Sequence, residues 1–128
     1  MNILESKNIN LLINFDSTII KDESLELLSE ISLKNSKDKK KIADITNDAM
    51  NGEIDFSDAL IRRITLLKAK EYHIEKVINK INNTITKSFI NNKIFFKNNN
   101  LNCYIISGGF VEIISPVLKI FYINKKNI

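Results

Sequence analysis

Two short apolar runs frame a long stretch with helical periodicity. The run Leu-Leu-Ile at residues 11–13 is branched and uninterrupted, which predicts a buried parallel strand. Residues 102–107 contain Cys, Tyr and two Ile in succession, and they predict a second strand. Between them, apolar positions recur every three or four residues, as in amphipathic helices. The pattern therefore predicts two strands separated by a mainly helical segment.

Several of the predicted helices have recognisable ends. Acidic residues at positions 22 and 23 precede the apolar positions that begin at Leu25, and they suit a helix N-terminus. A second helix carries Ile42 and Ala49 on one face and ends at Gly52, the residue type favoured just after a helix. Asp55 or Ser57 is predicted to begin the next helix.

The remaining helices are predicted from apolar spacing alone. The helix after position 55 places Phe56, Leu60, Ile64 and Leu67 on one face. Residues 71–81 form another amphipathic segment. One further helix is predicted for residues 86–98, and a last one for residues 111–121. Pro116 is expected to kink or restart that last helix, since proline has no N–H group to donate.

Polar residues follow the first strand at alternate positions. Asn14, Asp16 and Thr18 come directly after the apolar run. Ligands of open α/β sheets bind just beyond the carboxyl ends of the strands. This segment is therefore a candidate catalytic edge. The second strand ends in Ser-Gly-Gly-Phe at residues 107–110, where glycine lets the backbone approach an anion and a following helix adds its dipole.

These segments resemble the phosphoserine phosphatases of the haloacid dehalogenase superfamily. The first motif of that superfamily is an apolar strand followed by Asp-x-Asp-x-Thr, and this chain has Asn14, Asp16 and Thr18 at those positions. Residues 107–109 match the second motif. Residues 49–56, followed by Ala-Leu at 59–60 and Arg-Ile at 63–64, resemble the cap segment of phosphoserine phosphatases. The resemblance extends over essentially the whole chain.

The resemblance implies an α/β fold with a Rossmann-like parallel sheet of the haloacid dehalogenase type. The sheet would be incomplete, with a helical cap inserted after the first strand. Residues 1–20 and 84–128 would form the partial α/β core, and residues 21–83 would form the cap.

The resemblance also implies roles for individual residues. Position 14, here Asn14, corresponds to the nucleophile, and Asp16 corresponds to the general acid/base. Both positions would hold Mg²⁺, through the side chain at 14 and the backbone carbonyl of Asp16. The implied substrate is O-phosphoserine, which the enzymes hydrolyse to serine and phosphate in the last step of serine biosynthesis.

The implied substrate contacts come from both the cap and the phosphate loop. Glu23 would bind the amino group, Arg63 would pair with the carboxylate, and Ser107, Gly108 and Gly109 would hold the phosphate. Met50 and Phe56 would line the serine side of the substrate, although without the resemblance their spacing favours ordinary core residues. Arg62 is the competing arginine, but its spacing from Ala-Leu at 59–60 favours Arg63.

Two departures from the family bear on activity. Asn14 replaces the nucleophilic Asp, and a neutral amide is a poor nucleophile. The family's later Lys and Gly-Asp-Gly-x-x-Asn-Asp motif, which completes the Mg²⁺ site, do not occur in this sequence. The isolated chain is therefore predicted to be inactive. Three interpretations stay open: an enzyme completed by a second polypeptide, a non-catalytic phosphoserine-binding or regulatory module, and the degenerate product of a truncated gene.

Composition narrows the possible partners. The chain has 128 residues, 19 Lys and Arg, 15 Asp and Glu, and a net charge of +4. The lysine cluster at residues 37–41 is interpreted as a solvated helix face, so no nucleic-acid partner is expected. No membrane partner is expected either, because no stretch reaches spanning length and no signal peptide is visible. We therefore expect a cytoplasmic protein.

Three further expectations concern single residues and the sheet. The lone Cys103 cannot form an internal disulfide, and it is expected in the core. His73 has no neighbouring ligand residues in the sequence, and it is expected at the surface. The first strand is expected to lack a neighbour on one side. An exposed strand edge would favour self-association or pairing with a complementing C-terminal fragment.

Overall fold

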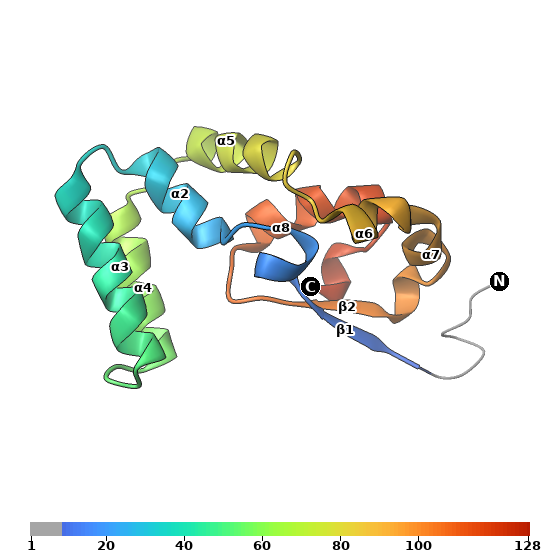
Figure 1. The fold of residues 1–128 in the computed structure, drawn as a ribbon, viewed down its shortest axis with the longest axis horizontal. Helices are drawn as coiled ribbons and strands as arrows, with labels where there is room; N and C mark the ends of the chain where they lie inside the picture. The colour runs from blue at the N-terminus through green and yellow to red at the C-terminus, as the bar shows by residue number, and fades with distance from the viewer. Residues whose placement is uncertain (1–8) are drawn as a thin grey trace.

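The computed structural model describes residues 9–128 and has an elongated α/β shape (Figure 1). Strand β1 (Leu11–Asn14) pairs in parallel with β2 (Cys103–Ile106). Leu11 lies opposite Cys103, and Asn14 lies opposite Ile106. Within the described residues these strands form a two-stranded sheet. The predicted α/β class and the parallel pairing are confirmed.

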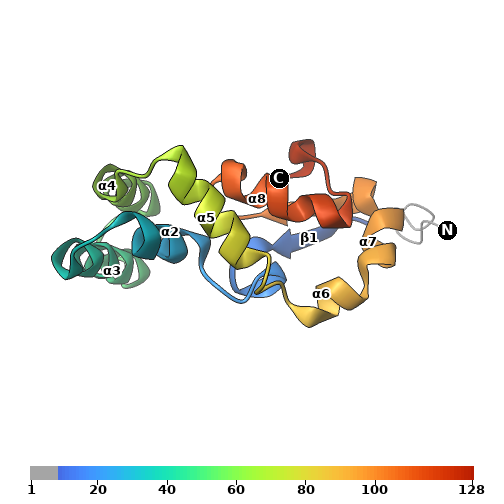
Figure 2. The same cartoon turned by 90° about the horizontal axis from the view of Figure 1, so that it is seen from above.

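A helical stretch connects the two strands, as predicted. Helices α3 (Ser36–Met50) and α4 (Phe56–Leu67) form a hairpin at the end of the molecule farthest from the sheet (Figure 1). Helices α2 (Ser24–Ser32) and α5 (Glu71–Ile81) lie between this hairpin and the sheet. Figure 2 shows α5 running between α2 and α8 (Val111–Leu118), and it packs against both.

Shorter elements complete the described chain. Helices α6 (Lys87–Asn91) and α7 (Lys93–Asn98) lie toward the opposite end from the α3–α4 hairpin. The turns η1, η2, η3 and η4 cover Phe15–Ile19, Asn100–Asn102, Lys119–Phe121 and Lys125–Asn127. In η1, the backbone of Asp16 and Ser17 is not helical, so this segment is a loop after β1.

The two ends of the helical stretch meet beside the sheet. Ile20 and Ile85 form an isolated antiparallel bridge. The Thr86 N–H donates to the Ile19 carbonyl at 2.9 Å, and the Lys21 N–H donates to the Thr84 carbonyl at 3.0 Å. The junction lies at the predicted cap boundaries of residues 20–21 and 83–84. The division into cap and core stays a prediction, because one apolar cluster includes residues from both segments.

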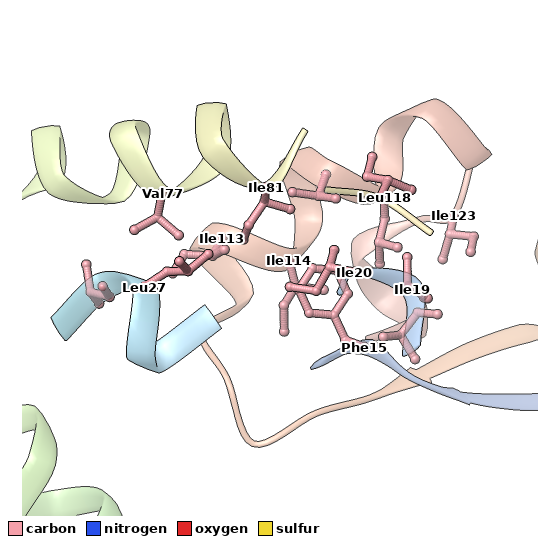
Figure 3. Close-up of a cluster of buried hydrophobic side chains, with 14 of the residues drawn as sticks. Phe15, Ile19, Ile20, Leu27, Val77, Ile81, Ile113, Ile114, Leu118 and Ile123 are labelled. Carbon is pink, nitrogen blue, oxygen red and sulfur yellow. The ribbon is translucent and has the colours of Figure 1, made fainter. Parts of the chain in front are cut away.

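That cluster is centred on α8 and the loop after β1 (Figure 3). Phe15, Ile113 and Ile114 are almost completely buried, and Leu27 of α2 and Val77 of α5 pack into the same cluster. Burial of such branched and aromatic side chains is the main stabilising contribution to a fold of this size. Cys103 lies in the core as expected, and burial raises the pKa of its thiol.

Only one face of the sheet is covered. Leu11, Ile13, Cys103 and Ile105 face the core, whereas Leu12 is 70% exposed. Successive side chains of a strand point to opposite faces, so Tyr104 and Ile106 of β2 are exposed as well. The prediction of a strand buried on both faces was therefore wrong for β1. A run of apolar residues does not indicate whether one face or both faces of a strand are covered.

Other departures from the predicted elements are local. The helix expected at residues 86–98 is broken at Asn92, whose φ of −110° and ψ of 25° are not helical. Ile94, which follows the break, is 76% exposed. Pro116 does not restart its helix, since α8 continues from Val111 to Leu118, and the alternative of a kink stays a prediction.

His73 was expected at the surface and is buried instead. Its Nδ1 accepts a hydrogen bond from the Lys70 N–H at 3.0 Å, which satisfies a donor at the start of α5. No helix within residues 9–128 combines the length and the apolar character required to cross a membrane.

Candidate functional site

A pocket opens at the carboxyl ends of both strands, where the sequence predicted a catalytic edge. Its volume of about 280 Å³ is slightly below the usual range for small-molecule sites. The loops after β1 and β2 form one wall, the start of α2 forms another, and α4 closes the far side. Its lining residues are Asn14, Asp16, Ser17, Glu23, Ser24, Leu25, Phe56, Arg63, Gly108 and Gly109.

Asp16 is held by both of its carboxylate oxygens. Oδ1 accepts a hydrogen bond from the Ser24 N–H at 2.6 Å, at the first residue of α2. Oδ2 accepts a hydrogen bond from the Ser107 hydroxyl at 2.9 Å. Asp16 therefore links the loop after β1 to α2 and to the loop after β2. Ser107 does not line the pocket itself, but it reaches the site through this contact.

The loop after β2 is shaped by the same network. The Ser107 Oγ accepts a hydrogen bond from the Gly109 N–H at 2.9 Å. A Cβ atom at Gly109 would lie 2.9 Å from the Ser24 Oγ and 3.1 Å from the Ser107 Oγ, so glycine is required by this close approach. The loop leads directly into α8, which begins at Val111.

Asn14, at the end of β1, faces its own loop. Its Nδ2 donates a hydrogen bond to the Asp16 backbone carbonyl at 2.6 Å and lies 3.5 Å from the Thr18 Oγ1. A carbonyl oxygen only accepts, so the amide nitrogen and not the amide oxygen must face it. The side chain at the predicted nucleophile position is thus engaged with the backbone two residues later.

Arg63 brings positive charge from α4 into the pocket. Its Nη1 donates weakly to the Thr46 Oγ1 at 3.4 Å, and its buried Nε has no hydrogen-bond partner among the described residues. Burial lowers the pKa of the guanidinium, and the charge of Glu26 opposes that shift. Within residues 9–128 Arg63 forms no salt bridge, and the planar fork of a guanidinium matches the two oxygens of a carboxylate.

Comparisons with known proteins identify relatives of the chain. A chloroplastic phosphoserine phosphatase of Arabidopsis thaliana is 32% identical over 113 residues, which are 88% of this chain and 37% of the relative. The phosphoserine phosphatase of Drosophila melanogaster is 31% identical over 88% of this chain and 40% of its own length. That of Campylobacter jejuni subsp. doylei is 30% identical over 87% of this chain and 51% of its own length.

A solved structure agrees with these relatives. A phosphoserine phosphohydrolase-like protein from Francisella tularensis superposes with a TM-score of 0.77 at 35% identity, over 93% of this chain and 56% of that one. This chain is a homologue of the phosphoserine phosphatases. The resemblance to that branch of the haloacid dehalogenase superfamily, and the incomplete fold of its type, are therefore confirmed. No protein-family model matches the chain.

This chain spans 37% to 51% of the length of the phosphoserine phosphatases named above. The roles of individual residues in those proteins therefore stay predictions here. The structure does bring most of the predicted residues to one pocket. Arg63 lines it, whereas its competitor Arg62 is exposed outside it, so the spacing argument selected the arginine that reaches the pocket.

Met50 and Glu23 lie differently with respect to the pocket, and their roles stay predictions. Met50 is 81% exposed and lines a neighbouring depression, which shares Phe56 and Arg63 with the main pocket. Phe56, at the start of α4, is 59% exposed, so neither side chain encloses the pocket tightly. Glu23 lies at the pocket but is exposed, and one of its oxygens accepts a hydrogen bond from the Ser17 hydroxyl.

Two serines of this chain line the pocket but were not predicted as site residues from the sequence. Ser24 is 1% exposed, donates its N–H to Asp16, and lies against Gly109. Ser17 has a left-handed φ of 55° and contacts Glu23. The position of Ser24 beside Glu23, at a predicted helix start, is a signal that could have identified it. The sequence offers no such signal for Ser17.

The Mg²⁺ site implied by the resemblance does not fit the residues that this structure brings together. The side chain at position 14 is neutral, and its N–H group points at the Asp16 carbonyl that would be a ligand. Mg²⁺ requires oxygen ligands in near-octahedral geometry, usually including carboxylates. Among the described residues, no cluster of three or more His, Cys, Asp or Glu side chains could hold a metal ion.

Proposed function

We propose that the pocket binds O-phosphoserine and that this chain, with Asn14, does not hydrolyse it. The observation that carries the proposal is Arg63, a partly buried cation at the pocket whose Nε has no hydrogen-bond partner and whose guanidinium forms no salt bridge within the described part of the chain. A free amino acid with a phosphorylated side chain supplies a carboxylate for such a group. The relatives and the structural neighbour are named for phosphoserine chemistry, which supports the same ligand.

The rest of the pocket has groups suited to the other ends of the ligand. Glu23 offers a carboxylate oxygen for an ammonium group. The Gly108 N–H, in the loop that leads into α8, offers a backbone donor for a phosphate, and the dipole of that helix favours negative charge near its start. Each charged group of the ligand would therefore meet a pocket group of complementary charge or polarity. The proposal keeps the cytoplasmic location and the connection to serine biosynthesis expected from the sequence.

Hydrolysis is excluded from the proposal on chemical grounds. The relatives' reaction is expected to begin with attack of a carboxylate on phosphorus, and the amide of Asn14 is a poor nucleophile. Loss of a hydrolase nucleophile can lower turnover by on the order of 10⁶. Asp16 is well oriented by Ser24 and Ser107, but an acid/base alone does not form the covalent intermediate.

Calorimetric titration with O-phosphoserine tests the binding proposal. We expect Arg63→Ala to weaken binding by about thirtyfold, or ~2 kcal/mol, because the ligand carboxylate loses its charged partner. Arg62→Ala is the matched control on the same helix, and it should leave the affinity within about twofold. Equal losses in the two variants, or no binding by the unaltered chain, would contradict the proposal. So would phosphate release above a protein-free blank.

A second candidate function is an enzyme completed by another polypeptide. The exposed apolar side chains of Leu12, Tyr104 and Ile106 favour it, because they offer a surface that such a polypeptide could cover. The test joins to this chain the segment of a related phosphatase that the chain does not match. The chimera with Asn14→Asp should release phosphate from O-phosphoserine, and the chimera with Asn14 should not. If the folded Asp chimera is inactive, this candidate fails.

A further inference from the structure

We infer that the amide of Asn14 takes the place of the metal ion, so that the pocket binds its phosphorylated ligand without Mg²⁺. This inference rests on the proposed function for the identity of the ligand. Its metal-free character rests separately on the contacts of Asn14, which can be tested with no ligand present. Asn14 would then have two effects: the chain lacks a nucleophile at this position, and ligand binding does not require a cation.

The first step is the hydrogen bond between positions 14 and 16. The Asn14 Nδ2 lies 2.6 Å from the Asp16 backbone carbonyl, a short distance for an N–H···O bond. A cation that bridged side chain 14 and this carbonyl would occupy the same gap between the two atoms. The N–H group already supplies positive charge to that carbonyl. A metal ion could enter only after this bond is broken.

The second step is that the alternative orientation of the amide gains little. Rotation of the Asn14 amide to present its Oδ1 would place an acceptor against the Asp16 carbonyl, with no hydrogen between them. It would offer a metal only two neutral oxygens. The nearest carboxylates are already engaged, since Asp16 accepts from Ser24 and Ser107, and Glu23 accepts from Ser17. These contacts oppose metal binding.

The third step concerns the charge that the ligand meets. The charged residues that line the pocket are Asp16, Glu23 and Arg63. A carboxylate at position 14 would add a further negative charge beside the phosphate, and a cation would then be needed to offset the repulsion. The neutral Asn14 removes that need. The Gly108 N–H, in the loop before α8, remains as a donor to the phosphate.

The experiment has a metal arm and a ligand arm. In the metal arm, the unaltered chain is titrated with Mn²⁺ alone, as a paramagnetic substitute for Mg²⁺, and free Mn²⁺ is followed by electron paramagnetic resonance. We expect no saturable binding below millimolar concentrations. Asn14→Asp should gain a Mn²⁺ site. The matched control is Asn98→Asp on the exposed end of α7, which adds the same charge far from the pocket and should gain none.

In the ligand arm, O-phosphoserine is titrated in EDTA and again in excess Mg²⁺. The unaltered chain should give affinities within about twofold of each other. Asn14→Asp should bind at least tenfold more weakly in EDTA than in Mg²⁺. Saturable Mn²⁺ binding by the unaltered chain below millimolar concentrations, or Mg²⁺-dependent affinity for O-phosphoserine in that chain, overturns the inference. If O-phosphoserine does not bind in either buffer, the proposed function fails, and the Mn²⁺ arm still decides whether the site excludes metal.

Discussion

At the scale of single residues, the polar groups of the pocket have little freedom to move. Asp16 is fixed through both carboxylate oxygens, and the Ser107 hydroxyl is fixed between Asp16 and Gly109. Pre-positioned donors and acceptors reduce the ordering that a ligand must impose, which favours binding. In the part of the chain that the structure describes, Arg63 keeps an unpaired Nε at the same pocket, and Glu23 accepts a hydrogen bond through only one of its oxygens, Oε1.

The two glycines of the loop should respond differently to added bulk. A Cβ at Gly109 would crowd the Ser24 and Ser107 hydroxyls, whereas a Cβ at Gly108 would meet only the exposed ring of Phe56. We expect Gly109→Ala to lower the free energy of unfolding by about 1–3 kcal/mol, the usual cost of overpacking. Gly108→Ala should cost less, because the ring can move. Urea denaturation compares them, and a larger loss at Gly108 would contradict this account.

Cys103 provides a probe of core integrity at the same scale. It is fully buried in β2, and burial raises the pKa of its thiol. The thiolate is the reactive form, so disulfide reagents should modify the folded chain slowly and the urea-unfolded chain rapidly. We expect a difference of at least tenfold in labelling rate at pH 7.5. Equal rates would mean that the β2 core face is open in solution.

At the scale of elements, a buried asparagine ties the last turn to β2. The Asn127 Nδ2 donates to the Cys103 carbonyl at 3.0 Å and to the Asn100 carbonyl at 3.2 Å, and the side chain is only 6% exposed. Asn127→Ala would leave these carbonyls without that donor, and we expect a loss of about 1–3 kcal/mol in unfolding free energy. Asn124→Ala, at an exposed position, is the control. Thermal unfolding measures both variants, and equal losses of unfolding free energy would contradict this role for Asn127.

The strands and most helices could be predicted from the sequence because their signals are local. The apolar runs, the acidic start of α2 and Gly52 after α3 each act within a few residues, and Gly52 has the positive φ of 77° expected there. The break at Asn92 could not be predicted, because the apolar spacing continues across it. Burial of His73 depends on its backbone contact with Lys70, which spacing does not reveal.

The candidate site could be predicted only in part, for a similar reason. Family motifs located Asn14, Asp16, Arg63 and the loop glycines, and the structure brings these residues to one pocket. The motifs do not report which groups bond to one another. The Asn14 contact with the Asp16 carbonyl follows from backbone geometry after β1, and the exposure of Met50 follows from the position of the α3–α4 hairpin.

At the scale of the whole molecule, the two faces of the sheet have different environments. The face toward α8 is part of the continuous core, while the opposite face presents Leu12, Tyr104 and Ile106. Leu12 lies opposite Tyr104 in the strand register, so these side chains are neighbours on one surface. Apolar surface next to an unpaired strand edge is a common starting point for association between chains.

Self-association through this face is therefore the last prediction. We expect the unaltered chain to sediment as a concentration-dependent mixture of monomer and larger species. The double variant Leu12→Lys with Ile106→Lys should shift it toward monomer, because charged side chains on the face cannot be buried against a second copy without a large desolvation cost. Ile94→Lys is the matched control, since Ile94 is 76% exposed on α7, away from the sheet face. If the unaltered chain is a monomer at every concentration, the face does not drive association. If the control disperses the larger species as well as the double variant does, added charge and not this face controls assembly.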